Sequence, residues 1–262
     1  MRLLKGYFQS ALMSATAQIG DNSLFAVTYL MRLLRVLLLL QIWRVVMHGR
    51  AEVSGYTLMH LLTYTLLSEA FRDMMECRTW LESSFWDGSI ATRLLRPIGV
   101  FGQFAAEWSG TIAFNLCLFS IPLLLCAPLM GVSALPTTPI AGLLALLSLG
   151  LAVMVGLGIE YVFAGIAIGV QVHPYVINQM RAALGALLSG AFIPLAILPF
   201  GLGKIFALLP FAGQASAPLS IYTGSTEIGF LLGLQLFWAV LLLGFAHWLW
   251  EKNREKMVAY GG

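Results

Sequence analysis

The stretch Leu231–Leu243, LLGLQLFWAVLLL, runs for thirteen residues without a charged side chain. Shorter uncharged apolar runs occur earlier in the chain, at 36–40 (VLLLL) and 143–147 (LLALL). A membrane-spanning helix needs roughly 20 mostly apolar residues, and each of these runs lies inside a longer apolar stretch. The pattern is typical of a protein that crosses a bilayer several times.

The composition supports the same conclusion. Of the 262 residues, 59% are hydrophobic and only 10% are charged, and the mean hydropathy is +0.86. A soluble domain carries about 25% charged residues, so this chain lacks the polar material to cover a surface in water. The net charge of +3 and the lack of a basic patch give no indication of a nucleic-acid partner. We therefore predict a single all-α polytopic membrane domain over residues 1–262.

Hydropathy and helical periodicity predict six transmembrane helices, preceded by an amphipathic interface helix over residues 1–22. The second expected span has weak hydropathy because it is rich in Thr and Tyr. Prolines break the stretch 199–227, whose apolar run is too short to cross, so we expect a re-entrant helical hairpin there. The expected spans are 24–47, 54–71, 101–130, 140–170, 176–198 and 228–250.

The distribution of Lys and Arg predicts the orientation, since cytoplasmic loops of membrane proteins are enriched in these residues. With both termini cytoplasmic, the polar segment 72–97 is cytoplasmic and the 199–227 hairpin is extracytoplasmic. Without the weak second span, the arginines of 72–97 would face outward, so the charge count supports that span. The cytoplasmic cations would be Arg2, Lys5, Arg72, Arg78, Arg93, Arg96, Lys252, Arg254 and Lys256, against Arg50 and Lys204 outside.

No catalytic, cofactor-binding or metal-binding motif stands out. Gly203-Lys204 fails the phosphate-binding loop pattern on both sides, so any ATP hydrolysis would have to come from a partner. The three cysteines have no spacing that indicates a disulfide framework or a zinc site. An intramembrane serine hydrolase is one alternative, because a serine with a histidine base could form a nucleophile. The candidate residues are Ser109, Ser189, His173 and His247.

Glu160 lies well inside the expected fourth span. An intramembrane carboxylate is costly unless it is paired or protonated, and is a candidate functional residue for that reason. It could serve as a proton site or a substrate contact, which would make the chain a proton-coupled secondary transporter. The alternative, which we favour over these functional roles, is that Glu160 is the structural partner of an arginine or tyrosine on a neighbouring helix. Arg32, Arg35 and Arg44 in the first span leave similar alternatives open: a subunit interface, a path for an anion, or anchors at the membrane surfaces.

The segment 72–97 contains a short amphipathic helix. Trp80, Leu81, Phe85 and Trp86 recur at helical spacing among charged residues. Such a helix could lie on the inner leaflet, or it could be a docking element that receives force from a cytosolic protein.

Four features together resemble a permease subunit of the ABC type-2 exporter superfamily, in its six-span permease branch. They are the amphipathic N-terminal helix, the sequence from Gly88-Ser89-Ile90 to Leu94-Leu95-Arg96-Pro97, the stretch 189–195 (SGAFIPL), and the hairpin 200–218 with Leu209-Pro210-Phe211 ahead of Tyr222-Thr223-Gly224. Their order and spacing cover almost the whole chain.

The resemblance implies an exporter of an amphipathic substrate such as a lipid, drug or peptide, in a bacterial plasma (inner) membrane. Two cytosolic ATP-binding subunits would hold ATP and Mg, and a second permease, identical or homologous, would complete the membrane domain. The implied ATPase-coupling residues are Arg78, Trp80, Glu82, Trp86, Asp87, Gly88, Arg93, Arg96 and Pro97. The implied translocation path or gate residues are Glu160, Phe192, Ile193, Pro194 and Pro210.

Overall fold

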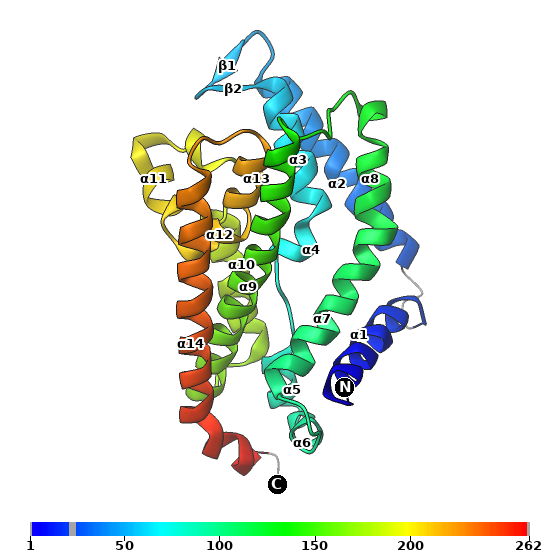
Figure 1. The fold of residues 1–262 in the computed structure, drawn as a ribbon, viewed down its shortest axis with the longest axis vertical. Helices are drawn as coiled ribbons and strands as arrows, with labels where there is room; N and C mark the ends of the chain where they lie inside the picture. Colours follow the sequence, from blue (N-terminus) through cyan, green and yellow to red (C-terminus); the bar gives the residue numbers. More distant parts are fainter. Residues whose placement is uncertain (1, 21–24, 261–262) are drawn as a thin grey trace.

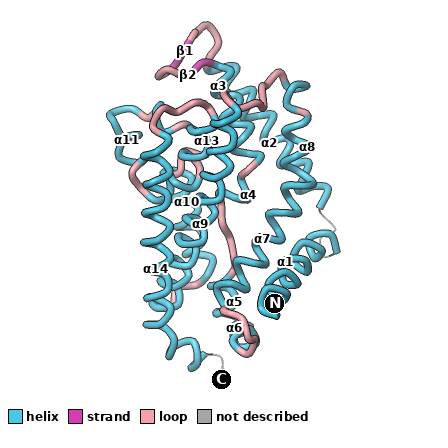
Figure 2. Tube along the Cα trace, viewed as in Figure 1, coloured by secondary structure: helices cyan, strands magenta, loops and turns pink. Residues whose placement is uncertain are grey.

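A computed structural model describes residues 2–20 and 25–260, and this part of the chain is almost entirely helical (Figures 1 and 2). Residues 1, 21–24 and 261–262, which include parts of the expected interface helix and first span, lie outside the described residues. The helices are α1 Arg2–Gly20, α2 Phe25–Val46, α3 Leu58–Ala70, α4 Arg72–Met75, α5 Leu81–Trp86, α6 Ile90–Leu94, α7 Val100–Asn115, α8 Ile121–Leu125, α9 Pro139–Val170, α10 Pro174–Leu188, α11 Leu202–Ala207, α12 Pro210–Gln214, α13 Ser216–Tyr222 and α14 Ile228–Tyr260. Short irregular turns are η1 Leu116–Ser120, η2 Ala127–Met130, η3 Leu195–Ile197 and η4 Pro199–Gly201, and the strands are β1 Glu52–Val53 and β2 Tyr56–Thr57.

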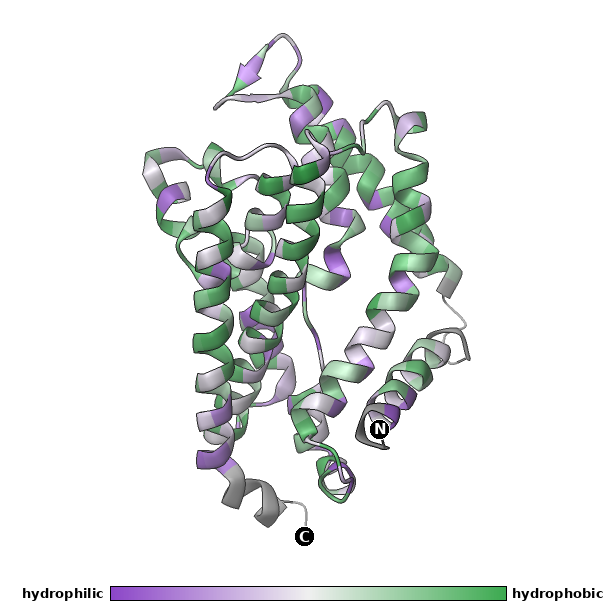
Figure 3. Ribbon diagram, viewed as in Figure 1, coloured by the Kyte–Doolittle hydropathy of each residue, from purple (hydrophilic) through white to green (hydrophobic). Residues whose placement is uncertain are grey.

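Four helical stretches of the described chain are long and apolar enough to cross a membrane: Ala26–Val46, Val100–Leu125, Pro139–Val170 and Ile228–Asn253. They match the expected first, third, fourth and sixth spans. Figure 3 shows hydrophobic residues along most of their length. The third is continuous only through the π-helical turn η1, which ends two residues before Pro122. Proline lacks the amide proton for a regular helical hydrogen bond, and π-helical turns occur mostly as short bulges inside α-helices.

The second and fifth spans differ from the expectation, because α3 has only 13 residues and α10 only 15. The antiparallel hairpin β1–β2 occupies 52–57, so the helix begins at Leu58. After α4 the chain continues without a helix through 76–80 and descends beside α9 (Figure 1). Met75, Cys77 and Thr79 are buried there. The charged segment expected at 72–97 therefore starts inside the bundle.

Helix α9 is the central element, and glycines bring α14 against it. A Cβ added at Gly158 would lie 2.7 Å from the Leu242 Cβ, and one at Gly165 would lie 3.0 Å from the Leu249 Cβ. The Asn253 side-chain amide donates to the Gly165 carbonyl oxygen at 2.8 Å. Small residues at this spacing let helices approach closely, and here they serve packing within the chain.

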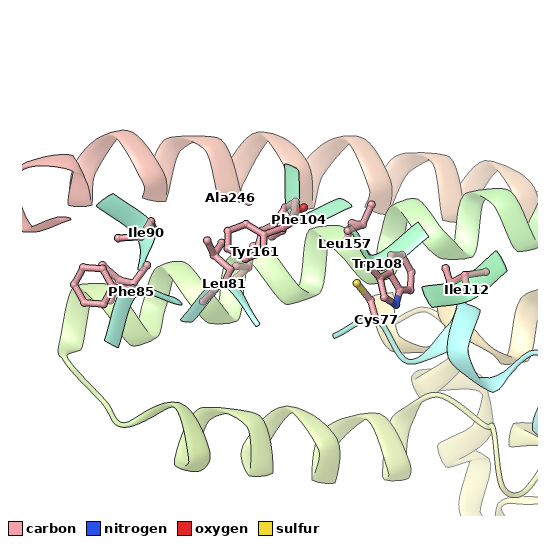
Figure 4. Packing of buried hydrophobic residues seen from close by; sticks show 13 residues of the cluster. Cys77, Leu81, Phe85, Ile90, Phe104, Trp108, Ile112, Leu157, Tyr161 and Ala246 are labelled. Carbon is pink, nitrogen blue, oxygen red and sulfur yellow. The ribbon is translucent and has the colours of Figure 1, made fainter. Parts of the chain in front are cut away.

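The largest buried apolar cluster fills the space between α9, α7 and the α5–α6 region (Figure 4). The Phe101 and Tyr161 rings stack with centroids 4.4 Å apart, and the Tyr161 hydroxyl donates to the Phe101 carbonyl oxygen at 2.6 Å. Trp108 and Cys77 belong to the same cluster, so the 76–80 stretch is part of the core. This packing fixes α5 and α6 at the end of the bundle where α1 begins and α14 ends (Figure 1).

The N-terminal helix α1, expected at the membrane interface, packs against α7. The Ser14 and Thr111 hydroxyls are 3.2 Å apart, and the Gly99 amide donates to the Tyr7 hydroxyl. Gly110 makes the contact possible, because a Cβ there would lie 1.9 Å from the Ala11 carbonyl oxygen.

We predict that Gly110→Val separates α1 from α7, because the Ala11 backbone cannot move away without shifting the helix. Thermal unfolding in detergent should show a clear fall in midpoint, consistent with the cost of about 1–3 kcal/mol for overpacking. Gly150→Val is the matched control, since a Cβ at Gly150 meets nothing within 4 Å. Equal midpoints for the two variants would contradict this packing.

Candidate functional site

The expected site residue Glu160 is buried in α9, with only 1% of its surface exposed. Its Oε1 accepts hydrogen bonds from the Thr79 amide at 2.6 Å and from the Thr79 hydroxyl at 3.1 Å. Its Oε2 forms an ion pair with Arg181 Nη1 at 3.0 Å. A buried charge is tolerated when it is paired and hydrogen-bonded, and Glu160 satisfies both conditions.

Arg181 extends this contact into a network that joins three elements. Its guanidinium also donates to the Cys77 carbonyl oxygen and, at 3.2 Å, to the Asn178 side-chain oxygen. Asn178 in turn donates to Glu82 of α5 at 2.5 Å. We call these five groups, the side chains of Thr79, Glu82, Glu160, Asn178 and Arg181, the Glu160 network. It ties the 77–82 segment to both α9 and α10.

Local backbone geometry brings the 77–82 segment to this position. Gly156 of α9 leaves room for the Cys77 Cβ, which would lie 3.2 Å from a Cβ at that glycine. Trp80 then adopts a left-handed backbone conformation with φ of 61°, and α5 begins at the next residue. A left-handed conformation is uncommon for a bulky residue, so Trp80 marks a sharp change of direction.

A second set of charges joins α2 to the α3–α4 region. Arg32 forms an ion pair with Asp73 at 2.8 Å, and Arg35 forms one with Glu69 at 3.2 Å. Arg72 lies between two carboxylates, 3.9 Å from Glu69 and 3.1 Å from Glu76. The arginines of the first span thus find carboxylate partners within the chain. Arg44 donates to the Met130 carbonyl oxygen.

Several expected coupling residues make contacts within the protein. Arg93 forms an ion pair with Glu107 of α7 at 2.6 Å and lies over the Phe104 ring. Trp86 is exposed and makes an edge-on contact with His173, while Glu82 is buried in the Glu160 network. These contacts anchor α5 and α6 to α7 and α10.

The turn between α5 and α6 is stabilised by its own polar groups. Asp87 accepts a hydrogen bond from the Ser89 amide at 2.8 Å. Hydrogen bonds from the Ser89 side chain and backbone hold the pKa of Asp87 below its ordinary value. Gly88 has φ of +77°, a conformation that favours glycine.

The residues after this turn form an exposed tip, which we define as Leu94–Pro97. Leu95 is 87% exposed and Leu94 is 45% exposed, and Arg96 and Pro97 are also exposed. The tip therefore presents two adjacent exposed leucines beside an exposed arginine. Arg78 and Trp80, also expected to couple, lie apart from the tip and contact each other, with the guanidinium 3.9 Å from the ring centroid.

The expected gate residues lie around the turn that follows α10. Gly190 has φ of +75°, and the Tyr64 hydroxyl donates to its carbonyl oxygen at 2.7 Å. Phe192 is partly buried and has Arg35 over its ring, Ile193 is exposed and Pro194 is buried. Pro210 begins α12, whose residues Phe211 to Gln214 are buried. Glu160 is not among the residues at this turn.

The serines considered as nucleophiles have other partners. Ser109 is exposed and donates to the Ala105 carbonyl oxygen, and Ser189 accepts from the Ala191 amide. Within the described residues no hydrogen bond joins either serine to His173 or His247. The geometry gives no support to a hydrolase site.

The sequence indicated Glu160 and an arginine or tyrosine partner on a neighbouring helix, but it did not identify that partner as Arg181. Thr79 and Asn178 were not singled out at all. The signal that could have linked the pair is chemical, because a buried carboxylate needs a cation and Arg181 lies in the adjacent helical segment.

Comparison with protein families gives one match. The family described as "ABC-2 family transporter protein" matches residues 33–261. Comparisons with curated proteins and with solved structures give no match.

We predict that Glu160→Gln and Arg181→Gln each destabilise the protein, because each leaves a buried partner without its counter-charge. Removing one partner of a buried pair costs about 3–5 kcal/mol, measured here as a lower unfolding midpoint in detergent. The double variant should lose less stability than the sum of the stability losses of the two single variants. Glu52→Gln, an exposed residue of β1, is the control. Strictly additive losses would show that the pair is not coupled.

Proposed function

Because the chain belongs to the ABC-2 family of transporter proteins, we propose that it is the permease subunit of an ATP-driven exporter. It forms part of the translocation path for an amphipathic substrate such as a lipid, drug or peptide. Two copies of a cytosolic ATP-binding subunit supply the energy, and a second permease, identical or homologous, completes the complex. The observation that carries the proposal is the family match over residues 33–261.

In this proposal α3 and α10 complete six crossings as interrupted spans. At about 1.5 Å per residue, α3 extends about 20 Å and α10 about 22 Å, less than the roughly 30 Å hydrocarbon core. For α3, the rest of the crossing is covered by α4 and residues 76–80. For α10, it is covered by the turn at 189–194. Irregular backbone is tolerated at membrane depth where protein buries it, and burial of Cys77 and Thr79 supports this arrangement. Helices α11 to α13 form the re-entrant hairpin.

The proposed orientation places α5, α6 and both termini on the cytoplasmic side of a bacterial plasma membrane. The Lys and Arg distribution supports it. The exposed tip Leu94–Pro97 then faces the cytosol, where an ATP-binding subunit can reach it.

The proposed coupling works through α5 and α6. A force applied to the tip passes to α7 through the Arg93–Glu107 ion pair, and to α9 and α10 through the Glu160 network. Charged and hydrogen-bonded contacts of this kind transmit displacement because they hold a defined geometry. The coupling role therefore belongs to the tip, and Glu82 and Arg93 act as its anchors.

A proton-coupled transporter using Glu160 is the second candidate. The geometry supports it less well, because both carboxylate oxygens are already occupied by Arg181 and Thr79. Release of a proton-binding carboxylate would require breaking that ion pair in each cycle.

We predict that Leu95→Asp strongly reduces co-purification of a co-expressed ATP-binding subunit, because a charge replaces the most exposed leucine of the tip. The recovered ATPase should fall roughly tenfold or more, as expected for a central contact residue, with an unchanged unfolding midpoint. Leu135→Asp is the matched control: Leu135 is 79% exposed in the loop at the other end of the bundle. Normal recruitment by Leu95→Asp, or no recruitment by the unaltered chain, would argue against the proposal.

A further inference from the structure

A cavity of about 540 Å³ lies between α10, the 72–78 segment and the region of α12. Small-molecule sites span roughly 300–1,000 Å³, so this volume suits one headgroup and a single hydrocarbon chain. The tip Leu94–Pro97 contributes nothing to its wall, whereas the expected gate residue Phe192 and the expected coupling residue Arg78 both do. The cavity therefore lies between these two predicted regions.

One face of α10 forms a wall of the cavity and changes character along its length. The lining residues in the first half of α10 are polar or charged, and those further along are small. In order they are Tyr175, Asn178, Gln179 and Arg181, followed by Ala182, Gly185 and Ala186. The cavity therefore has a polar end and an apolar end.

The charges at the cavity wall are mostly compensated. Arg72 of the 72–78 segment pairs with Glu76, and Arg181 of α10 pairs with Glu160. Among the described residues, Arg78 takes part in no ion pair, although it lines the cavity and lies over the Trp80 ring. One guanidinium without a carboxylate partner therefore remains at the wall. A guanidinium binds phosphate or carboxylate groups well because its donors match their geometry.

The less polar end is lined mainly by aromatic rings and small residues, with the side chains of Ser189 and Gln214 also at the wall. Phe192 and Phe211 contribute to it, and α10 presents Gly185. A Cβ added at Gly185 would meet nothing within 4 Å, so this part of the wall leaves open space. Removal of a hydrocarbon chain from water into such a space is favourable.

We infer that this cavity binds a single-chain amphiphile with an anionic headgroup, with the headgroup at Arg78 and the chain against Phe192 and Phe211. This binding role deepens the proposed function and rests on it for the direction of transport. In the proposed orientation, the polar end of the cavity faces the cytoplasmic side. The substrate class is then an anionic amphiphile taken from the cytoplasmic leaflet.

The test uses the purified full chain in detergent, without any ATP-binding subunit. The probes are a lysophosphatidic acid with a diazirine at the end of its chain and the matched lysophosphatidylcholine. After illumination, peptide mass spectrometry locates the adducts. We expect adducts of the anionic probe within 182–192 and 211–215, and weaker capture of the zwitterionic probe.

Two variants test the two ends of the cavity. Gly185→Leu should reduce adducts roughly tenfold by filling the apolar end, whereas Gly150→Leu, with equal open space on α9, should not. Arg78→Gln should weaken binding of the anionic probe roughly tenfold, the loss of one hydrogen bond to a charged group. It should weaken the zwitterionic probe less, because the choline cation offsets the charge of that probe's phosphate. Lys252→Gln, an exposed cation of α14, is its control. If Gly185→Leu lowers the unfolding midpoint, competition by unlabelled lysophosphatidic acid on the unaltered chain takes the place of this variant as the test, and it should reduce the adducts.

Adducts spread over the outward-facing residues Met180 and Leu184, and unaffected by Gly185→Leu or by competitor, would overturn the cavity assignment. Equal capture of both probes, unchanged by Arg78→Gln, would overturn the anionic headgroup. Because no ATPase is present, either failure leaves the proposed exporter function standing. If the chain binds the anionic probe in the cavity but recruits no ATP-binding subunit, the exporter proposal is refuted while the binding site remains supported.

Discussion

The buried carboxylate of Glu160 is the constraint on which the middle of this structure depends. A charge in the interior of a membrane bundle must be compensated, and here Arg181 supplies the opposite charge while Thr79 supplies two hydrogen bonds. These partners come from α10 and from the 76–80 stretch. The requirement to satisfy one side chain therefore holds an irregular segment and a short helix against α9.

This arrangement connects the two ends of the proposed mechanism. The exposed tip Leu94–Pro97 stands on α5 and α6, which are fastened to α7 by Arg93 and to α10 by Glu82 and Asn178. The same Arg181 that neutralises Glu160 also lines the cavity beside α10. A displacement of the tip by a partner would thus reach the cavity wall through few contacts, which is the property a coupled permease requires.

The sequence was sufficient for the four long spans, because each contains more than 20 residues of continuous apolar helix. It misplaced the starts and ends of α3 and α10, since tertiary contacts determine them: β1–β2 delays α3, and the Gly190 turn ends the α10 region. The partners of Arg32 and Arg35 could not be predicted either, because several carboxylates between 69 and 76 were available. The coupling residues were predicted only as a group, because whether each side chain faces a partner or the interior depends on packing that periodicity cannot resolve.

The most direct test of the account is transport by proteoliposomes that contain this chain with the ATP-binding subunit that co-purifies with it. A fluorescent single-chain anionic amphiphile would report movement between leaflets. The account predicts movement that requires ATP and continues when the pH gradient is collapsed. Movement driven by a pH gradient in the absence of any ATP-binding subunit would contradict it.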